Sequence, residues 1–283
     1  MSEMEVTDRI TSAGPQLTAA ERRVAQVVLE RPQLVAFGTV ADLAMQAKAG
    51  AATVVRLAGK LGFDGFSALQ SSVQADLSRQ LRPPVERIRE LSDHQPVERH
   101  RAIATQNLVS TFDSISRPDL EEVVSLLSDV ARPVLMLAGD AEYGVGLQFV
   151  HDLNALRAGV SVVGGNEVTV RRLIATSDAD STLVVIDLRR YERWLLQTVS
   201  TSKELGHTIV ALSDGPLSPL AMAADFSFTL AAHSASPFDS HTATLALLEL
   251  LVAGVAESIR DLAAPRLEQA EAAWRAAGSL TDR

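Results

Sequence analysis

Residues 39–63, TVADLAMQAKAGAATVVRLAGKLGF, constrain the fold most, because they read as two short amphipathic helices joined by a tight turn. In each half apolar residues recur at i, i+3, i+4 and i+7, first at Val40, Leu43, Ala44 and Ala47, then at Val54, Leu57, Ala58 and Leu61. The second helix carries Thr53, Arg56 and Lys60 on another face. Such a helix suits reading of the DNA major groove. The pattern alone fits an ordinary helical hairpin, with solvated Arg and Lys, equally well.

The net charge of −9 is unfavourable for a polyanionic partner, but it is unevenly distributed. Residues 1–82 hold nine Arg and Lys against eight Asp and Glu, a net of +1. The remaining 17 basic and 27 acidic residues give −10. The N-terminal region is therefore free to meet DNA through a local basic face. Because a net charge of +1 attracts DNA phosphates only weakly, useful affinity requires a dimer or a larger oligomer.

Several kinds of site are excluded by composition. Cysteine is absent, which removes disulfides and thiolate metal sites, and the six histidines show no metal-ligand spacing. The N-terminus, MSEMEVTDRI, has no signal-peptide pattern. The longest apolar run, residues 244–256, contains Glu249 and is shorter than the ~20 residues that a membrane span needs. We expect a cytoplasmic protein without cofactor, metal or membrane partner.

The N-terminal region reads as a helical bundle. Thr18 and Glu21 have the spacing of a capping box at the start of a helix, which Pro32 is expected to close. A further amphipathic helix follows the hairpin over residues 66–81, and Arg82-Pro83-Pro84 breaks it. We predict a helix-turn-helix bundle over residues 1–82 and a helical linker over residues 83–117.

Beyond the linker the pattern changes to alternating strands and helices. Continuous apolar runs at residues 134–138, 160–163, 182–186, 208–212 and 226–230 are separated by helical segments. Such runs are typical of a parallel sheet that helices cover on both faces. We predict a doubly wound α/β domain with a five-stranded parallel sheet over residues 118–262, then a C-terminal helix within residues 263–283.

Ligands in such sheets bind beyond the carboxyl ends of the strands. Two loops stand there: one after the first strand, with Gly139, Asp140, Glu142 and Tyr143, and one after the third, with Asp187, Arg189, Arg190 and Tyr191. The acids of the first loop repel phosphate, whereas the arginines of the second can fork onto a carboxylate or phosphate. Alternatively, Asp140 or Glu142 pairs with Arg189 or Arg190. No spacing indicates a nucleophile with its base, so catalysis is not expected.

Both halves resemble one known family. LTAAERRVAQVVLERP and VADLAMQAKAGAATVVRLAGKLGFDGFSALQ are similar to the helix-turn-helix domain of RpiR/MurR-type bacterial transcriptional regulators. TIVALSD, SPLAMAA and DFSFTLA resemble their sugar isomerase (SIS) domain. The resemblance implies operator DNA as a partner and favours the recognition helix over the plain hairpin. The residues then expected at DNA are Lys48, Gly50, Ala52, Thr53, Arg56 and Lys60.

The sequence departs from this family in its loops. The turn, usually Gly, an apolar residue and Ser, is Lys48-Ala49-Gly50, so Lys48 is expected in a left-handed conformation and Gly50 at the helix N-cap. The phosphate-binding loops of the SIS domain become GDAEY at residues 139–143 and DLRRYE at residues 187–192. Either Arg189 and Arg190 replace the lost donors for an anionic ligand, or the effector is not phosphorylated, or the domain only dimerises.

The expected function is therefore a regulator whose SIS-like domain senses a small sugar-derived metabolite, such as a sugar phosphate or another sugar-derived acid. It is expected to act as a homodimer or homotetramer. One alternative is a SIS-type sugar-phosphate isomerase. The other is a dimeric adaptor that senses nothing.

Overall fold

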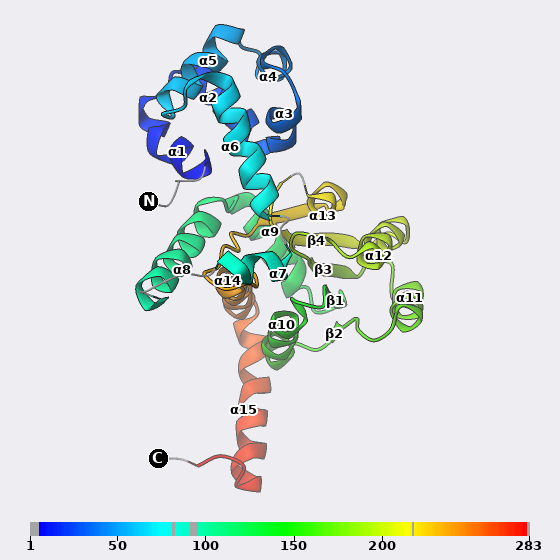
Figure 1. Cartoon of the computed structure of the whole chain (residues 1–283). Coiled ribbons are helices and arrows are strands. Elements are labelled where there is room, and N and C mark those ends of the chain that lie inside the picture. The colour runs from blue at the N-terminus through cyan, green and yellow to red at the C-terminus, as the bar shows by residue number, and fades with distance from the viewer. Residues whose placement is uncertain (1–5, 81–82, 91–95, 217, 282–283) are drawn as a thin grey trace. The chain divides into compact units, whose positions relative to one another are not determined.

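The computed structural model describes residues 6–80, 83–90, 96–216 and 218–281. The chain divides into two compact units, Met1–Glu86 and Arg87–Arg283. The first is built from helices and the second from a sheet with its covering helices (Figure 1).

The described residues of the first unit form mainly these helical segments: α1 (Val6–Ala13), η1 (Gly14–Gln16), α2 (Ala19–Glu30), α3 (Pro32–Phe37), α4 (Val40–Gln46), α5 (Ala51–Lys60) and α6 (Gly65–Gln80). Their apolar faces form one core, in which Val24, Leu43, Val54, Leu57 and Leu69 are fully buried. The predicted capping box at Thr18 and Glu21 is confirmed, and Thr39 and Asp42 form another at α4. Pro32 ends α2 as expected, but it also begins α3, because proline is favoured at the first helical position.

The boundary between the two units falls within α7 (Pro84–Arg87). The second unit then contains η2 (Ile88–Glu90), α8 (Pro96–Asp113) and α9 (Arg117–Ser128). The α/β region then follows as β1 (Val134–Ala138), α10 (Tyr143–Leu156), β2 (Val160–Val162), α11 (Glu167–Ala175), β3 (Thr182–Ile186), α12 (Arg193–Glu204), β4 (Thr208–Ser213), α13 (Pro219–Ala223) and β5 (Phe226–Thr229). The chain ends with α14 (Thr242–Ser258) and α15 (Arg260–Ala277).

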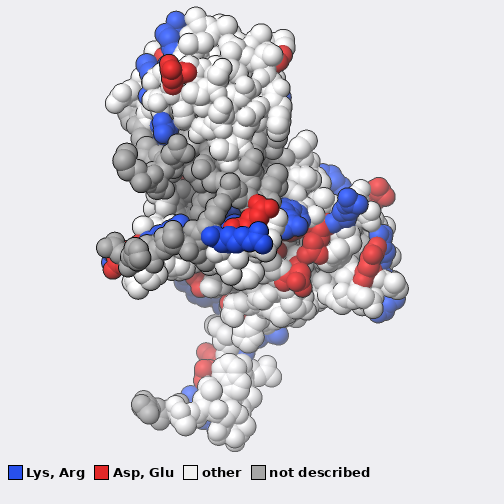
Figure 2. Space-filling model, viewed as in Figure 1, with Lys and Arg blue, Asp and Glu red and all other residues white. Residues whose placement is uncertain are grey.

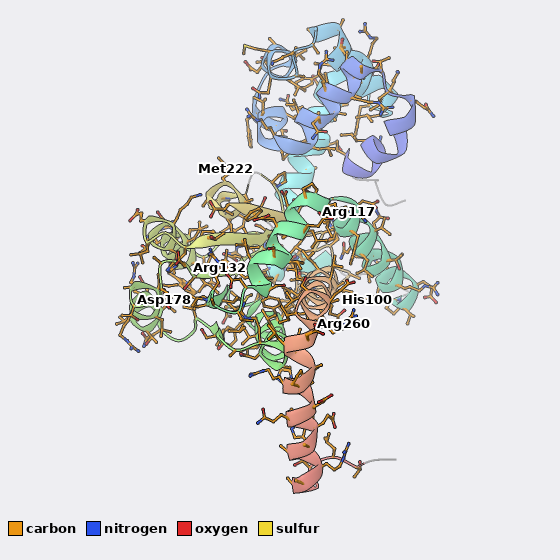
Figure 3. All side chains as sticks on the ribbon, turned by 180° about the vertical axis from the view of Figure 1, so that it is seen from behind. His100, Arg117, Arg132, Asp178, Met222 and Arg260 are labelled. Carbon is orange, nitrogen blue, oxygen red and sulfur yellow. The ribbon has the colours of Figure 1, made fainter. Side chains whose placement is uncertain are left out.

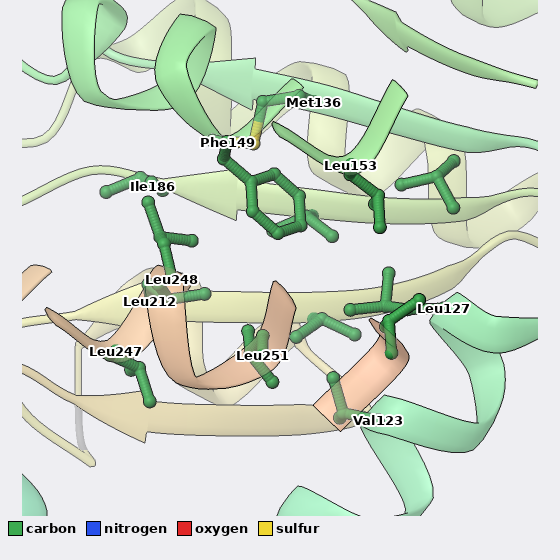
Figure 4. Close-up of a cluster of buried hydrophobic side chains, with 14 of the residues drawn as sticks. Val123, Leu127, Met136, Phe149, Leu153, Ile186, Leu212, Leu247, Leu248 and Leu251 are labelled. Atoms are coloured by element: carbon green, nitrogen blue, oxygen red, sulfur yellow. The ribbon is translucent and has the colours of Figure 1, made fainter. Parts of the chain in front are cut away.

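The predicted five-stranded parallel sheet is confirmed, with the order β2-β1-β3-β4-β5. Alternate residues of each strand face opposite sides, so two cores form. One packs Met136, Ile186 and Leu212 against α9, α10 and α14 (Figure 4). The other packs Leu137, Val185 and Ile209 against α11, α12 and α13. Because the strand order reverses between β1 and β3, a crevice is expected at their carboxyl ends.

One arginine is a structural part of this unit. Arg157 follows α10 and is 2% exposed. Its guanidinium donates to the carbonyl oxygens of Leu127 (2.6 Å), Asp129 (2.7 Å) and Arg132. Burial lowers its pKa. Arg157 therefore binds the end of α9, and the loop that leads into β1, to the end of α10.

The C-terminal helix starts earlier than its sequence indicates. The break between the last two helices falls at Ile259 rather than near residue 263, and Pro265 lies inside α15. Past Ala263 almost every residue of α15 is exposed, and its side chains stand out from the body of the unit (Figure 3). Among the described residues, no single helix meets the length and hydropathy of a membrane span; α14 and α15 together meet them, with a bend of 103° between them.

Candidate functional site

The helix-turn-helix consists of α4, the turn of residues 47–50 and α5. Lys48 adopts the expected left-handed conformation, with φ of 47°, and its side chain is exposed. Gly50 is the N-cap of α5 and offers no side-chain bond to the first turn. The amides at the start of α5 therefore form an uncapped helix N-terminus on the surface, with no acidic residue in the first turn.

Arg23 of α2 holds this turn through two hydrogen bonds. Its Nε donates to the carbonyl of Ala47 (3.2 Å) and its Nη2 to the carbonyl of Lys48 (3.1 Å). These carbonyls lie at the end of α4, where no helical amide follows to bind them. Arg23 therefore sets the angle at which α5 leaves the turn.

The outward face of α5 differs from the predicted one. Ala52 and Arg56 are exposed as expected, together with Ala51, Val55 and Gly59. Thr53 is only 7% exposed, and its hydroxyl accepts a hydrogen bond from Nη2 of Arg56 at 3.0 Å. The reason is helical geometry, because residue 53 stands one turn before Leu57, in the row that faces the core.

Lys60 also serves another role than expected. Its Nζ lies 2.7 Å from Oε2 of Glu21 and donates to the carbonyl of Gln16. The hydrogen bond from Lys60, with that from the Thr18 amide, lowers the pKa of Glu21 to about 2. Lys60 thus ties the end of α5 to the start of α2. This leaves Arg56 as the cation at the centre of the exposed face of α5, while the visible surface of the unit is mostly uncharged (Figure 2).

The strained residue of the turn gives a first prediction. A Lys48→Gly variant is expected to stabilise residues 39–63 by about 1 kcal/mol relative to Lys48→Ala, because alanine keeps the Cβ that disfavours a left-handed backbone. Hydrogen exchange of peptides covering residues 39–63, followed by mass spectrometry, measures this difference. Equal protection in the two variants would contradict it.

In the second unit, three carboxylates converge where β1 and β3 end. A Cβ on Gly139 would lie 2.7 Å from Oε2 of Glu142, 2.9 Å from Oδ1 of Asp187 and 3.2 Å from Oε1 of Glu192. Any larger residue at this position would displace one or more of these carboxylates. The loop is held by two backbone amides, that of Asp140 donating to Oε1 of Glu192 (2.6 Å) and that of Glu192 to Oδ2 of Asp187 (2.9 Å).

These carboxyl groups are electrostatically unfavourable neighbours. Burial, followed by the charge of Asp187, raises the pKa of Glu142 to about 8. Burial is also the main cause that raises the pKa of Asp187 to about 7. At neutral pH Glu142 is mostly protonated and Asp187 is partly protonated.

The arginines of the second loop do not pair with the acids of the first. Nη1 of Arg189 donates to Oδ1 of Asp239 (3.0 Å), and Nη1 of Arg87 donates to the same oxygen (2.7 Å). Both Arg189 and Arg190 have left-handed backbones, with φ of 43° and 35°. Tyr191 donates to Asp214 instead of facing a ligand loop, and burial raises its pKa.

A cavity of about 400 Å³ lies beside the carboxylates, at the carboxyl ends of β1 and β2. Asp140 and Tyr143, both predicted as ligand residues, line it, whereas the other predicted residues do not: Gly139, Glu142, Asp187, Arg189, Arg190 and Tyr191. The other residues that give it chemical character are Gly164, Gly165, Glu167, Glu192 and Trp194. Within the described parts of the chain, no group of three or more His, Asp or Glu residues is placed to hold a metal ion.

The sequence-based prediction included neither these further lining residues nor Asp239. Gly164-Gly165 directly follows β2 and Glu192 closes the DLRRYE loop, so both carried a usable signal: their position at a strand end. Asp239 carried none, because it lies 50 residues from Arg189 in a segment without regular structure.

Comparison with known protein families identifies a known domain in each of the two units. Residues 4–80 match the helix-turn-helix domain of the RpiR family, and residues 129–254 match the SIS domain. An HTH-type transcriptional regulator of Haemophilus influenzae is 26% identical over 227 residues, which cover 78% of each chain.

Two solved structures share the fold. The sugar isomerase domain of an RpiR transcription factor from Sphaerobacter thermophilus covers 63% of this chain and 99% of its own, with a TM-score of 0.57 and 22% identity. The Vibrio vulnificus NanR protein, solved in complex with ManNAc-6P, covers 98% of this chain and 99% of its own, with a TM-score of 0.55 and 19% identity. The chain thus carries a helix-turn-helix domain of the RpiR family followed by a SIS domain, the domain composition of a transcriptional regulator.

Proposed function

We propose that the first unit binds operator DNA through α5, and that the SIS domain senses a small metabolite and controls that binding. The observation that carries the proposal is the exposed stripe of α5. It begins at an uncapped helix N-terminus, continues over small residues and holds Arg56 at its centre. Helix N-termini bind phosphate, small residues permit close approach to the groove, and arginine reads guanine edges.

Arg56 is held ready rather than engaged elsewhere. Among the described residues its side chain has one hydrogen-bond partner, the hydroxyl of Thr53, which stands one turn back on the same helix. Exchanging that single hydrogen bond to a hydroxyl for a bidentate contact to guanine is favourable. Arg23 and Lys60, by contrast, bind the protein itself and set the position of α5.

A gel-shift titration with the DNA upstream of its own gene tests this role. Arg56→Ala is expected to weaken specific binding by about 10- to 100-fold, because one bidentate base contact is lost. Arg31→Ala is the control, since it removes the same charge from the exposed end of α2. Equal losses in the two variants would mean that only total charge matters, and unchanged affinity for Arg56→Ala would remove Arg56 from the interface.

We further propose that the protein acts as a homodimer or homotetramer. One copy offers few cations to DNA, because Arg23 and Lys60 are engaged internally. Two copies double the phosphate contacts and thus steepen the dependence of affinity on salt. Light scattering of the free protein and its DNA complex would show at least two chains per operator.

The SIS-type isomerase remains the rival function. The helix-turn-helix domain and the description of the Haemophilus relative as a transcriptional regulator favour regulation. Incubation with aldose and ketose phosphates decides between them, because conversion of either at a rate above the buffer control would support the enzyme.

A further inference from the structure

We infer that the cavity at the ends of β1 and β2 binds a sugar that carries a protonated amine and no phosphate. This inference rests on the proposed sensing function and names the chemical class of its effector. It is carried by the charge of the cavity wall, by a buried carboxyl beside it and by two aromatic side chains.

The charged side chains of the cavity wall are all acidic. Asp140, Glu167 and Glu192 line it, and none of the described lining residues is Lys, Arg or His. Glu167 is already paired with Arg171 on the next turn of α11. Neither Asp140 nor Glu192 forms an ion pair with a cationic side chain of the described residues. A phosphate in this cavity would face two unneutralised carboxylates, whereas an ammonium group would neutralise them.

Glu142, which lies next to the cavity wall, strengthens the same preference for an ammonium group over a phosphate. Its side chain is buried, and no other described residue donates a hydrogen bond to it. Its Oε2 points to the space above Gly139, which Oε1 of the lining residue Glu192 also approaches. A buried carboxyl without a cationic partner is unusual in a folded protein. An ammonium group in the adjoining cavity would supply such a partner.

The aromatic side chains indicate a ring. The phenol of Tyr143 lies against Gly164, where a Cβ would come within 3.0 Å of the hydroxyl oxygen, so glycine leaves the space that Tyr143 occupies. The indole of Trp194 donates to Oε2 of Glu192, which fixes its orientation. Aromatic faces attract both cations and the apolar faces of ring compounds. A volume of about 400 Å³ suits a small molecule, within the roughly 300–1,000 Å³ typical of ligand sites.

The arginines of the DLRRYE loop, and Arg87, do not reverse this charge. Arg189 is bound to Asp239, as is Arg87, and neither lines the cavity. Arg190 is exposed and lies outside the lining as well. On the visible face of the second unit, acidic side chains are interspersed with Lys and Arg (Figure 2). The cavity lining, whose charged side chains are all acidic, thus differs from this visible face, where both signs occur.

The test is a binding titration of the full chain at pH 7 with three sets of sugars: glucosamine, galactosamine and mannosamine; the matching neutral hexoses; and the 6-phosphates of those hexoses. Fluorescence of Trp194, which lies in the cavity wall, and the melting temperature report binding. At least one amino sugar is expected to bind about tenfold more tightly than its neutral hexose, because hydrogen bonds to charged groups are the stronger ones. The hexose phosphates are expected to bind more weakly still.

Two variants locate the site. Asp140→Asn and Glu192→Gln keep hydrogen-bonding side chains and remove the charge, so the preference for the amine should fall about tenfold in each. Glu271→Gln, on the exposed part of α15, removes the same charge elsewhere and should leave the preference unchanged.

Tighter binding of a hexose phosphate, equal binding of amine and neutral sugars, or no binding across the panel would each overturn the inference. DNA binding, measured separately by the Arg56→Ala gel shift, would stand in all three cases. The failure of this inference is thus distinguishable from failure of the DNA-binding proposal.

Discussion

Replacing Arg157 by methionine is expected to destabilise the SIS domain by about 3–5 kcal/mol, because carbonyl oxygens of Leu127, Asp129 and Arg132 lose their donor. Methionine fills much of the same volume, so the loss reports the hydrogen bonds rather than a cavity. For a unit of this size, the melting temperature should fall by roughly 10 °C.

Tryptophan fluorescence isolates this effect. Both tryptophans, Trp194 and Trp274, lie in the second unit, so the signal follows that unit alone. Arg171→Met is the matched control: Arg171 is exposed and forms an ion pair with Glu167 on the same helix, so less than about 1 kcal/mol should be lost. A fall of similar size in both variants would show that Arg157 is not a structural tie.

Glu142→Gln is expected to stabilise the SIS domain at alkaline pH. In the folded protein the pKa of Glu142 is about 8, whereas an unfolded glutamate has a pKa of about 4.3. Between these values the folded state binds more protons than the unfolded one, so wild-type stability falls as pH rises through this window. Glutamine carries no charge to bury. The variant should therefore exceed wild type by on the order of 2–4 kcal/mol near pH 9 and match it near pH 4.5.

The measurement is the difference in unfolding free energy between the two proteins from pH 4.5 to 9, again by tryptophan fluorescence. Taking the difference cancels groups that do not interact with Glu142, whereas Asp187, whose charge acts on Glu142, contributes to the difference as well. Glu249→Gln, on the exposed side of α14, should keep the wild-type slope. A difference that does not change with pH would show that Glu142 is ionised in the folded protein throughout.

The elements of the fold could be predicted because their signals are local. Apolar runs bounded by turn residues predicted the five strands, and the stripe at Val54, Leu57, Ala58 and Leu61 predicted which side of α5 is buried. The outward face was harder to predict. Thr53 stands at the border of the buried row, and the long side chain of Lys60 reaches across to α2. A ten-residue helix has room for several polar faces, and only its neighbours decide among them.

The position of the cavity could be predicted, but most of its lining residues could not. Parallel strands bring their carboxyl ends together, which indicated the loop after β1, and Asp140 and Tyr143 of this loop line the cavity. Pairing between the loops could not be foreseen, because the partner of Arg189 is Asp239, in an irregular segment before α14. Long-range ion pairs leave no periodic trace in a sequence.

That segment has a mechanical consequence. A single oxygen, Oδ1 of Asp239, holds both Arg189, in the loop after β3, and Arg87, the first residue after the DNA-binding unit. Two guanidiniums on one oxygen compete, so withdrawing either strengthens the hold on the other. We therefore expect a change at Arg189 to alter the ion pair of Arg87 at the start of the linker, and a double-mutant cycle on Arg87 and Arg189 would give the size of this coupling.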